Sequence, residues 1–149
     1  MKVSDFLVPA QIMIDVRAND KGRLLEQLST EAAAAIGLDA DDVVREIAKR
    51  EELGSTGVGK GVALPHARLR ALKAPFGLLV RLRHTIDFDA IDGEQVDIVV
   101  LLLIPEAGDG AKGNPLACVA RALRDTEVLR MIRSAPDRDA LFRVIASAA

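Results

Sequence analysis

The feature that most constrains this chain is an unbroken aliphatic run from Ile98 to Ile104. The run is far shorter than the roughly 20 apolar residues that a membrane-spanning helix requires. It is typical of a strand that is buried on both faces, as found in layered α/β folds. We therefore predict a central strand from Val96 to Ile104.

Segments with helical spacing and short strand-like segments alternate along the rest of the sequence. Further strands are predicted at Gln11–Val16, Val62–His66 and Phe76–Leu82. Helices are predicted after the N-cap candidates Asn19 and Asp20, over Asp41–Glu52 behind Asp39, from Leu116 to Leu123, and from near Ser134 with Pro136 in the first turn. This mixture, in 149 residues without a linker or repeat, predicts one layered α/β domain over residues 1–149.

Composition narrows the class of protein further. Hydrophobic residues make up 50% of the chain but aromatic residues only 3%, so the core must consist mainly of Leu, Ile, Val and Ala. A formal net charge of -2 implies no broad cationic field, and we expect no nucleic-acid partner. The N-terminus has neither the apolar core nor the cleavage site of a secretory signal. We therefore expect a cytoplasmic protein without membrane insertion.

Four glycines stand close together after the second predicted helix, at Gly54, Gly57, Gly59 and Gly61. Glycine tolerates positive φ angles, which let successive backbone N–H groups point into one concavity. Such a concavity is an anion-binding nest. The spacing therefore predicts a phosphate-binding loop over these residues.

Side chains around the loop add chemistry to it. Ser55 and Thr56 offer hydroxyl groups, and Arg50, at the end of the preceding helix, offers a forked and permanently charged donor. His66 follows the loop, and imidazole is both nucleophilic and largely neutral near pH 7. The residues alone leave two interpretations open. One is a phosphate site with a nucleophile beside it, and the other is a flexible glycine loop with a structural histidine.

A nucleoside-triphosphate site is a rival interpretation of the same loop. Gly54, Gly59 and Lys60 satisfy the first seven positions of the pattern G-x-x-x-x-G-K-[ST]. The eighth position is Gly61, which has no hydroxyl group for Mg²⁺. The pattern also needs a strand before it and a helix after it, whereas here the order is reversed. We therefore reject this interpretation.

The stretch from residue 50 to residue 66 resembles a known signature. That signature is the one of the IIA components of the bacterial phosphoenolpyruvate-dependent phosphotransferase system, in the fructose, mannitol and nitrogen-regulatory group. There, R-E-x-x-G-S-T-G precedes an aliphatic run that ends in A-[hydrophobic]-P-H. This chain has Arg50-Glu51, Gly54-Ser55-Thr56-Gly57 and Ala63-Leu64-Pro65-His66. Phe88 to Gly93, followed by Val96-Asp97, also resembles the family pattern, and the likeness covers nearly the whole chain.

The resemblance implies a three-layer α/β/α sandwich around a mixed β-sheet. It also implies an enzyme, a phosphohistidine phosphotransferase component whose phosphoacceptor is His66. The phosphoryl donor would be the phosphohistidine of the small carrier HPr or of NPr, its relative in the nitrogen branch. The group would then pass to a IIB domain or stay as a mark read by a regulatory target protein. Neither a cofactor nor a metal is required.

Physical chemistry agrees with this role. Phosphoryl transfer between two imidazoles is nearly energy-neutral, so the protein must mainly position the groups and neutralise charge. Arg50, Ser55, Thr56 and the N–H groups of the loop are the donors that we assign to the equatorial oxygens. Pro65 should fix the approach of His66, and a backbone carbonyl should hold the ring nitrogen that does not react.

The sequence departs from the family at one position. Many members carry a second histidine at the start of the helix after the central strand, but no histidine follows Pro105 here. Alignment backwards from Leu116 places Lys112 at that position, or Asn114 after a small shift. Lys112 could substitute as a point-charge donor, or onward transfer could be weakened so that the protein acts as a regulator. The alternative is that Lys112 is a solvated loop lysine.

We expect a free-standing IIA domain of the nitrogen-regulatory branch. Its free-standing form and the segment Gly54-Ser55-Thr56-Gly57-Val58-Gly59 favour this assignment. The second hypothesis is a sugar-specific IIA component, for fructose or mannitol, that passes phosphate to a IIB domain. The third is a degenerate anion-binding regulatory module that has lost transfer.

Overall fold

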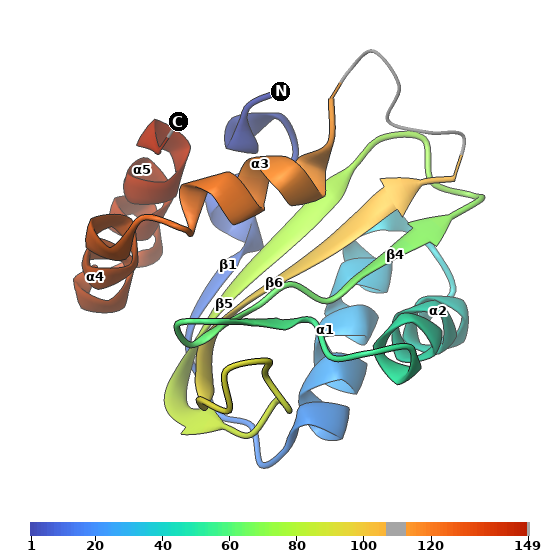
Figure 1. The fold of residues 1–149 in the computed structure, drawn as a ribbon. Coiled ribbons are helices and arrows are strands. Elements are labelled where there is room, and N and C mark those ends of the chain that lie inside the picture. Colours follow the sequence, from blue (N-terminus) through green and yellow to red (C-terminus); the bar gives the residue numbers. More distant parts are fainter. Residues whose placement is uncertain (107–112, 149) are drawn as a thin grey trace.

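The computed structural model describes residues 1–106 and 113–148. A mixed sheet lies between two layers of helices (Figure 1). One face of the sheet is covered by α1 (Lys21–Ile36) and α2 (Ala40–Glu52). The other face is covered by the 3-10 turns η1 (Val3–Asp5) and η2 (Pro9–Gln11) and by the helices α3 (Pro115–Ala122), α4 (Thr126–Ser134) and α5 (Arg138–Ser147). The predicted three-layer α/β/α sandwich is therefore confirmed.

The sheet contains six strands in the described residues. They are β1 (Ile12–Val16), β2 (Gly57–Gly59), β3 (Val62–Ala63), β4 (His66–Leu69), β5 (Phe76–Ile86) and β6 (Val96–Pro105). Their order is β1-β5-β6-β3-β2, with β4 also paired to β6. The pairs β1–β5, β3–β6 and β4–β6 are parallel, whereas β5–β6 and β2–β3 are antiparallel. The sheet is thus mixed, with β6 at its centre.

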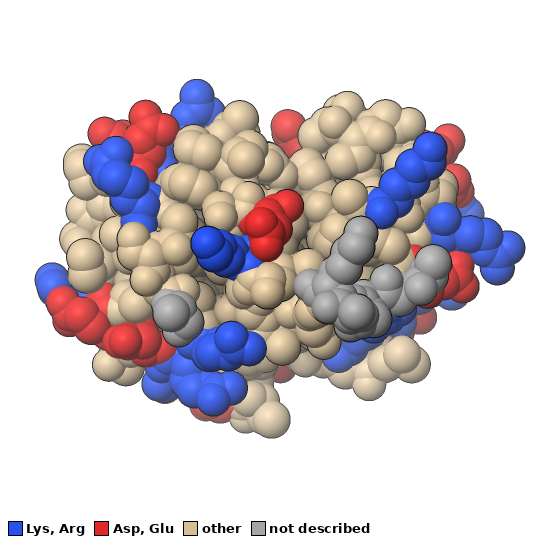
Figure 2. Space-filling model, turned by 90° about the horizontal axis from the view of Figure 1, so that it is seen from above, with Lys and Arg blue, Asp and Glu red and all other residues tan. Residues whose placement is uncertain are grey.

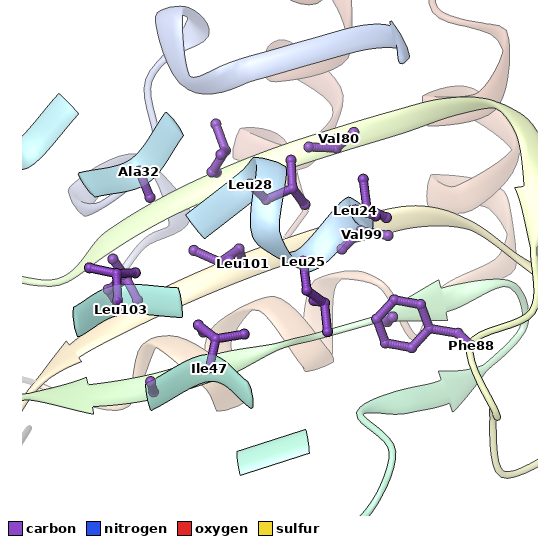
Figure 3. Packing of buried hydrophobic residues seen from close by; sticks show 14 of the residues in the cluster. Leu24, Leu25, Leu28, Ala32, Ile47, Val80, Phe88, Val99, Leu101 and Leu103 are labelled. Atoms are coloured by element: carbon purple, nitrogen blue, oxygen red, sulfur yellow. The ribbon is translucent and has the colours of Figure 1, made fainter. Parts of the chain in front are cut away.

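Strand β6 is buried on both faces, as its aliphatic run predicts. Its odd-numbered residues Val99, Leu101 and Leu103 pack into the core beneath α1 and α2. Ile98, Val100 and Leu102 pack into the core beneath α3, α4 and α5. Complete burial of each such side chain contributes about 1.5–3 kcal/mol of hydrophobic free energy. Figure 3 shows side chains of α1, α2, β5 and β6 converging in the first of these cores, with Phe88 at its edge.

The two helices before the glycine-rich segment begin where the sequence indicates. The Asp20 side chain accepts the N–H of Arg23 at the start of α1, and Gly37 ends that helix with a φ of 71°. The Asp39 side chain accepts the N–H groups of Asp41 and Asp42 at the start of α2. These caps satisfy donors that have no partner inside the helix. Because α1 and α2 pack together, the end of α2 is held firmly over the sheet.

Four elements differ from the sequence-based prediction. The predicted strand Val62–His66 is two strands, because Pro65 interrupts it and β4 begins at His66. The glycine-rich segment contains a strand, β2, that was not predicted. Helix α4 was also missed, and the last helix is capped by Asp137 rather than by Ser134, so Pro136 precedes it. The Asp125 cap and the spacing of Leu129 and Ile132 were signals for α4 that the prediction did not use.

The surface carries charges of both signs. In Figure 2, patches of Lys and Arg lie among patches of Asp and Glu, separated by uncharged residues. This agrees with the formal net charge of -2. Within residues 1–106 and 113–148, no helix is both long enough and apolar enough to cross a membrane.

A stability prediction follows from Ser29 of α1. Its hydroxyl is buried and, among the described residues, is the one buried side-chain oxygen or nitrogen without a hydrogen-bond partner. Ser29→Ala should raise the free energy of unfolding by about 1 kcal/mol, because it removes a desolvated hydroxyl and improves helix propensity. Urea unfolding followed by circular dichroism measures the change. Thr30→Ala, at the exposed neighbouring position, controls for propensity and should gain less; an unchanged or lower stability of Ser29→Ala would contradict the prediction.

Candidate functional site

The position of His66 follows from the interruption of a strand. Strand β3 pairs with β6 at Ile98 and Val99, and β4 resumes the pairing with His66 opposite Leu102. Pro65 lies between the two strands and has no N–H group to donate. Its carbonyl still accepts the N–H of Leu102 at 2.9 Å. His66 is therefore held against the central strand at a point where the backbone ladder is broken.

One ring nitrogen of His66 is fixed by the backbone. Nδ1 lies 2.8 Å from the carbonyl oxygen of Leu64. A carbonyl oxygen can only accept a hydrogen bond, so Nδ1 carries the proton in this contact. In the neutral ring, Nε2 is then the nitrogen with the free lone pair. The half-buried imidazole is thereby set up as a nucleophile through Nε2.

His66 and Arg50 line the same cavity, which lies between α2 and β4 and has a volume of about 740 Å³. Nη1 of Arg50 donates to the carbonyl of Gly54 at 2.9 Å, at the end of α2. In the described part of the chain, the other four N–H groups of this guanidinium have no partner. The cavity therefore joins a fixed imidazole with a forked cationic donor, an arrangement suited to a phosphoryl group.

The hydroxyl groups of Ser55 and Thr56 are bonded within the protein. Ser55 Oγ donates to the carbonyl of Phe88 at 2.6 Å and accepts the N–H of Gly57 at 3.0 Å. Thr56 is only 3% exposed, and its hydroxyl donates to the carboxylate of Glu51. Neither residue lines the cavity that His66 and Arg50 share. In this structure the two hydroxyls hold the loop in place.

Two of the four glycines of the predicted phosphate loop have their N–H groups bonded within the protein. The N–H of Gly54 donates to the carbonyl of Glu51, and that of Gly57 donates to Ser55. From Gly57 onward the chain forms the β2–β3 hairpin, with Gly59 and Gly61 near its turn. The carbonyl of Gly61 accepts the N–H of Ile98. His66 lies opposite Leu102, four residues further along β6, and four residues of a strand span about 13 Å at 3.3 Å per residue. Gly57, Gly59 and Gly61 serve the hairpin and its close packing, and the phosphate-loop role of the four glycines stays a prediction.

The hairpin turn is clamped to other parts of the fold. Arg133 of α4 donates through Nε to Asp97 at 2.9 Å and through Nη2 to the carbonyl of Lys60 at 2.6 Å. The Asp92 carboxylate accepts the N–H groups of Glu94 and Lys60, and these two bonds lower its pKa below the ordinary value. Sequence reasoning missed this clamp, because its members are far apart in the chain and match no motif.

The two candidates for the second family histidine have different outcomes. Lys112 lies outside the described residues, so its predicted role stays a prediction. The side chain of Asn114 is the N-cap of α3, where its oxygen accepts the N–H groups of Leu116 and Ala117. Asn114 thus has a structural role in this fold.

The comparisons with known proteins identify the family. Residues 5–148 match the family described as phosphoenolpyruvate-dependent sugar phosphotransferase system, EIIA 2. The chain belongs to this family. A nitrogen regulatory protein of Bradyrhizobium diazoefficiens is 38% identical over 146 residues, which cover 98% of this chain and 95% of that protein. A fructose-like EIIA component of Escherichia coli is 29% identical over 128 residues, 85% of this chain and 86% of that protein.

A solved structure of the same family agrees with the fold of this IIA protein. The nitrogen regulatory protein IIA-Ntr of Neisseria meningitidis superposes with a TM-score of 0.86 at 28% sequence identity. The match covers 96% of this chain and 98% of that one. Among the described residues of this chain, no group of His, Cys, Asp and Glu side chains is arranged to hold a metal ion.

The contacts that clamp the hairpin turn predict how a substitution at Gly61 changes the stability of the protein. Gly61 has a φ of 79°, and a Cβ there would lie 2.6 Å from Nη2 of Arg133 and 3.0 Å from the Asp97 carboxylate. Gly61→Ala should lower the free energy of unfolding by about 1–3 kcal/mol, through backbone strain and displacement of the clamp. Gly37→Ala is the matched control, because Gly37 has a similar φ of 71° and open space around its Cβ position. Equal losses in urea unfolding of the two variants would argue against the clamp.

Proposed function

We propose that this IIA protein accepts a phosphoryl group on Nε2 of His66 from the phosphohistidine of an HPr- or NPr-type carrier. The observation that carries the proposal is the contact between Nδ1 of His66 and the Leu64 carbonyl. In the neutral ring, that contact leaves the lone pair on Nε2, beside the cavity that Arg50 also lines. A neutral imidazole whose lone pair is already oriented needs no separate general base.

The chemical step is a displacement between two imidazoles. The lone pair of Nε2 forms a bond to phosphorus, while the bond from phosphorus to the donor nitrogen breaks and its electron pair returns to the donor ring. One P–N bond replaces another, so the protein mainly supplies position and charge. Arg50 is the residue that we assign to the equatorial oxygens of the transferred group. We assign Ser55 and Thr56 to holding the loop behind it.

The surface around the site supports a protein as the donor. Leu53, Val58 and Ile91 are large apolar side chains that are 85%, 54% and 87% exposed. Leu53 lines the cavity with His66, and the N–H of Ile91 donates to the carbonyl of Gly57, next to Val58. A large apolar side chain left exposed at the cavity, such as Leu53, suits contact with a protein partner. A small phosphate ester would have no use for them.

We infer a regulatory role of the nitrogen type for the phosphorylated and unphosphorylated forms. The relatives named as nitrogen regulatory proteins support it, because they are more similar in sequence than the fructose-like component. A charge of about -2 added at the His66 cavity would change which partner binds there. The sugar-specific alternative, with a IIB domain as acceptor, is supported by the fructose-like relative and is tested by adding such a IIB domain to the phosphorylated protein.

The acceptor assignment is tested by intact-mass measurement. The purified protein is incubated with phosphoenolpyruvate, enzyme I and an HPr- or NPr-type carrier. The wild type should gain the mass of one phosphoryl group, and His66→Ala should gain none. His84→Ala is the matched control, since His84 is the other histidine of the chain and is exposed. Labelling of His66→Ala would overturn the assignment, and failure of the wild type with every carrier would favour the anion-binding alternative.

The role of Arg50 is tested by the rate of the same reaction. Arg50→Ala should slow phosphorylation by about 10²–10³-fold, the usual loss when a donor to developing charge is removed. Arg50→Lys should recover only part of the rate, because it restores the charge but not the fork. Arg45→Ala, on the same helix but paired with Asp42, is the control and should react normally. A normal rate in Arg50→Ala would refute the role.

A further inference from the structure

One buried charged cluster beside the site has no part in the proposed transfer. Glu51 follows Arg50 in the last turn of α2, and its side chain is only 6% exposed. Nζ of Lys21, at the start of α1, lies 2.8 Å from its carboxylate. Thr56 donates to the same carboxylate through its hydroxyl and through its backbone N–H, the latter at 3.2 Å. A largely buried carboxylate with several donors is a rigid anchor, because loss of any donor leaves charge uncompensated.

The cluster connects three segments that are remote in sequence. Nζ of Lys21 also donates to the carbonyl of Phe88 at 3.3 Å and lies 4.7 Å from the centre of the Phe88 ring. Ser55 donates to the same carbonyl. Glu51 at the end of α2 and the carbonyl of Phe88 therefore bond the turn at residues 54–57, and Lys21 at the start of α1 bonds both of them. Figure 3 shows Phe88 at the edge of the core beneath α1 and α2.

A continuous path of hydrogen bonds leads from the anchor to the imidazole. The carbonyl of Thr56 accepts the N–H of Leu64 at 2.9 Å. The carbonyl of Leu64 accepts Nδ1–H of His66 at 2.8 Å. Leu64 is only 2% exposed, so water does not compete for these bonds. The orientation of the carbonyl that selects the tautomer of His66 thus depends on where Thr56 is held.

We propose that Glu51, paired with Lys21, is a positioning residue for His66. It fixes Thr56, Thr56 fixes Leu64, and the Leu64 carbonyl keeps the proton on Nδ1 and the lone pair on Nε2. Glu51 does not touch the phosphoryl group. Lys21 neutralises it, so the anchor adds no uncompensated negative charge near the incoming phosphoryl oxygens. The kinetic consequence of the proposal rests on the proposed function, whereas its consequence for the imidazole does not.

The test that is independent of phosphoryl transfer measures the His66 ring. Nitrogen-15 chemical shifts of the imidazole give the fraction of the Nδ1–H tautomer, and the His66→Ala spectrum assigns the signals. Wild type should have Nδ1–H as its main tautomer, and Glu51→Gln should shift a substantial fraction to Nε2–H. Glu52→Gln is the matched control, because Glu52 is adjacent on the same helix but exposed, and it should leave the tautomer unchanged.

The second measurement is the rate of phosphorylation by the carrier. Glu51→Gln should be slowed about 10- to 100-fold, as expected for a displaced nucleophile. Ile145→Val in α5 lowers stability on the far side of the sheet and should change neither the tautomer nor the rate. If Glu51→Gln folds and keeps both the wild-type tautomer and the wild-type rate, the proposal is overturned. It is also overturned if Ile145→Val shifts the tautomer as much as Glu51→Gln does.

Two further outcomes, misfolding of Glu51→Gln and failure of wild-type phosphorylation, each have their own control. If Glu51→Gln fails to fold because Lys21 is left without its partner, the double variant Lys21→Met, Glu51→Gln removes both charges, and a wild-type tautomer in it would overturn the proposal. If the wild type itself is not phosphorylated by any carrier, the proposed function fails. The tautomer of Glu51→Gln then still decides whether the anchor positions His66.

Discussion

The rest of the structure depends on burying β6 on both faces while pairing its backbone on both edges. The aliphatic side chains of the strand supply the hydrophobic free energy, but its polar backbone must find partners inside the protein. One edge is satisfied by β5 over nearly its whole length. The other edge is satisfied by two short strands, β3 and β4, that follow one another. The site lies at the junction of these two strands.

At that junction, the interruption of the strand pairing frees a backbone carbonyl to bond the His66 ring. Pro65 offers no N–H, so the segment at Leu64 and Pro65 cannot continue a regular parallel pairing. The Leu64 N–H turns to the hairpin and its carbonyl turns to His66. A carbonyl that would otherwise join the sheet instead selects the protonation state of one ring nitrogen. The histidine thus gains a preferred tautomer from a backbone carbonyl.

The glycine-rich segment and the buried Lys21–Glu51 pair hold the backbone around His66 in place, although they do not line the cavity. The β2–β3 hairpin, from Gly57 to Ala63, brings the backbone of Thr56 beside that of Leu64. The contact between Arg133 and Asp97 holds the turn of this hairpin. Arg50 is left at the end of α2 with most of its donors available to the cavity. Arg50 and His66 line the cavity, whereas Glu51, Ser55 and Thr56 do not. The larger number of polar groups nearby holds the backbone that places them.

Much of the fold was determined by the sequence itself. The aliphatic run of β6, the caps of α1 and α2, and the family signature from Arg50 to His66 are local patterns. They predicted the layered fold and singled out Arg50 and His66, which line one cavity in the structure. Only the tertiary structure decided which strands lie beside β6, that the glycines form a hairpin, and that Lys21, Glu51 and Thr56 meet. The reason is physical. Periodicity and capping act over a few residues, whereas a buried ion pair or a strand pairing joins segments whose separation in sequence leaves no local trace.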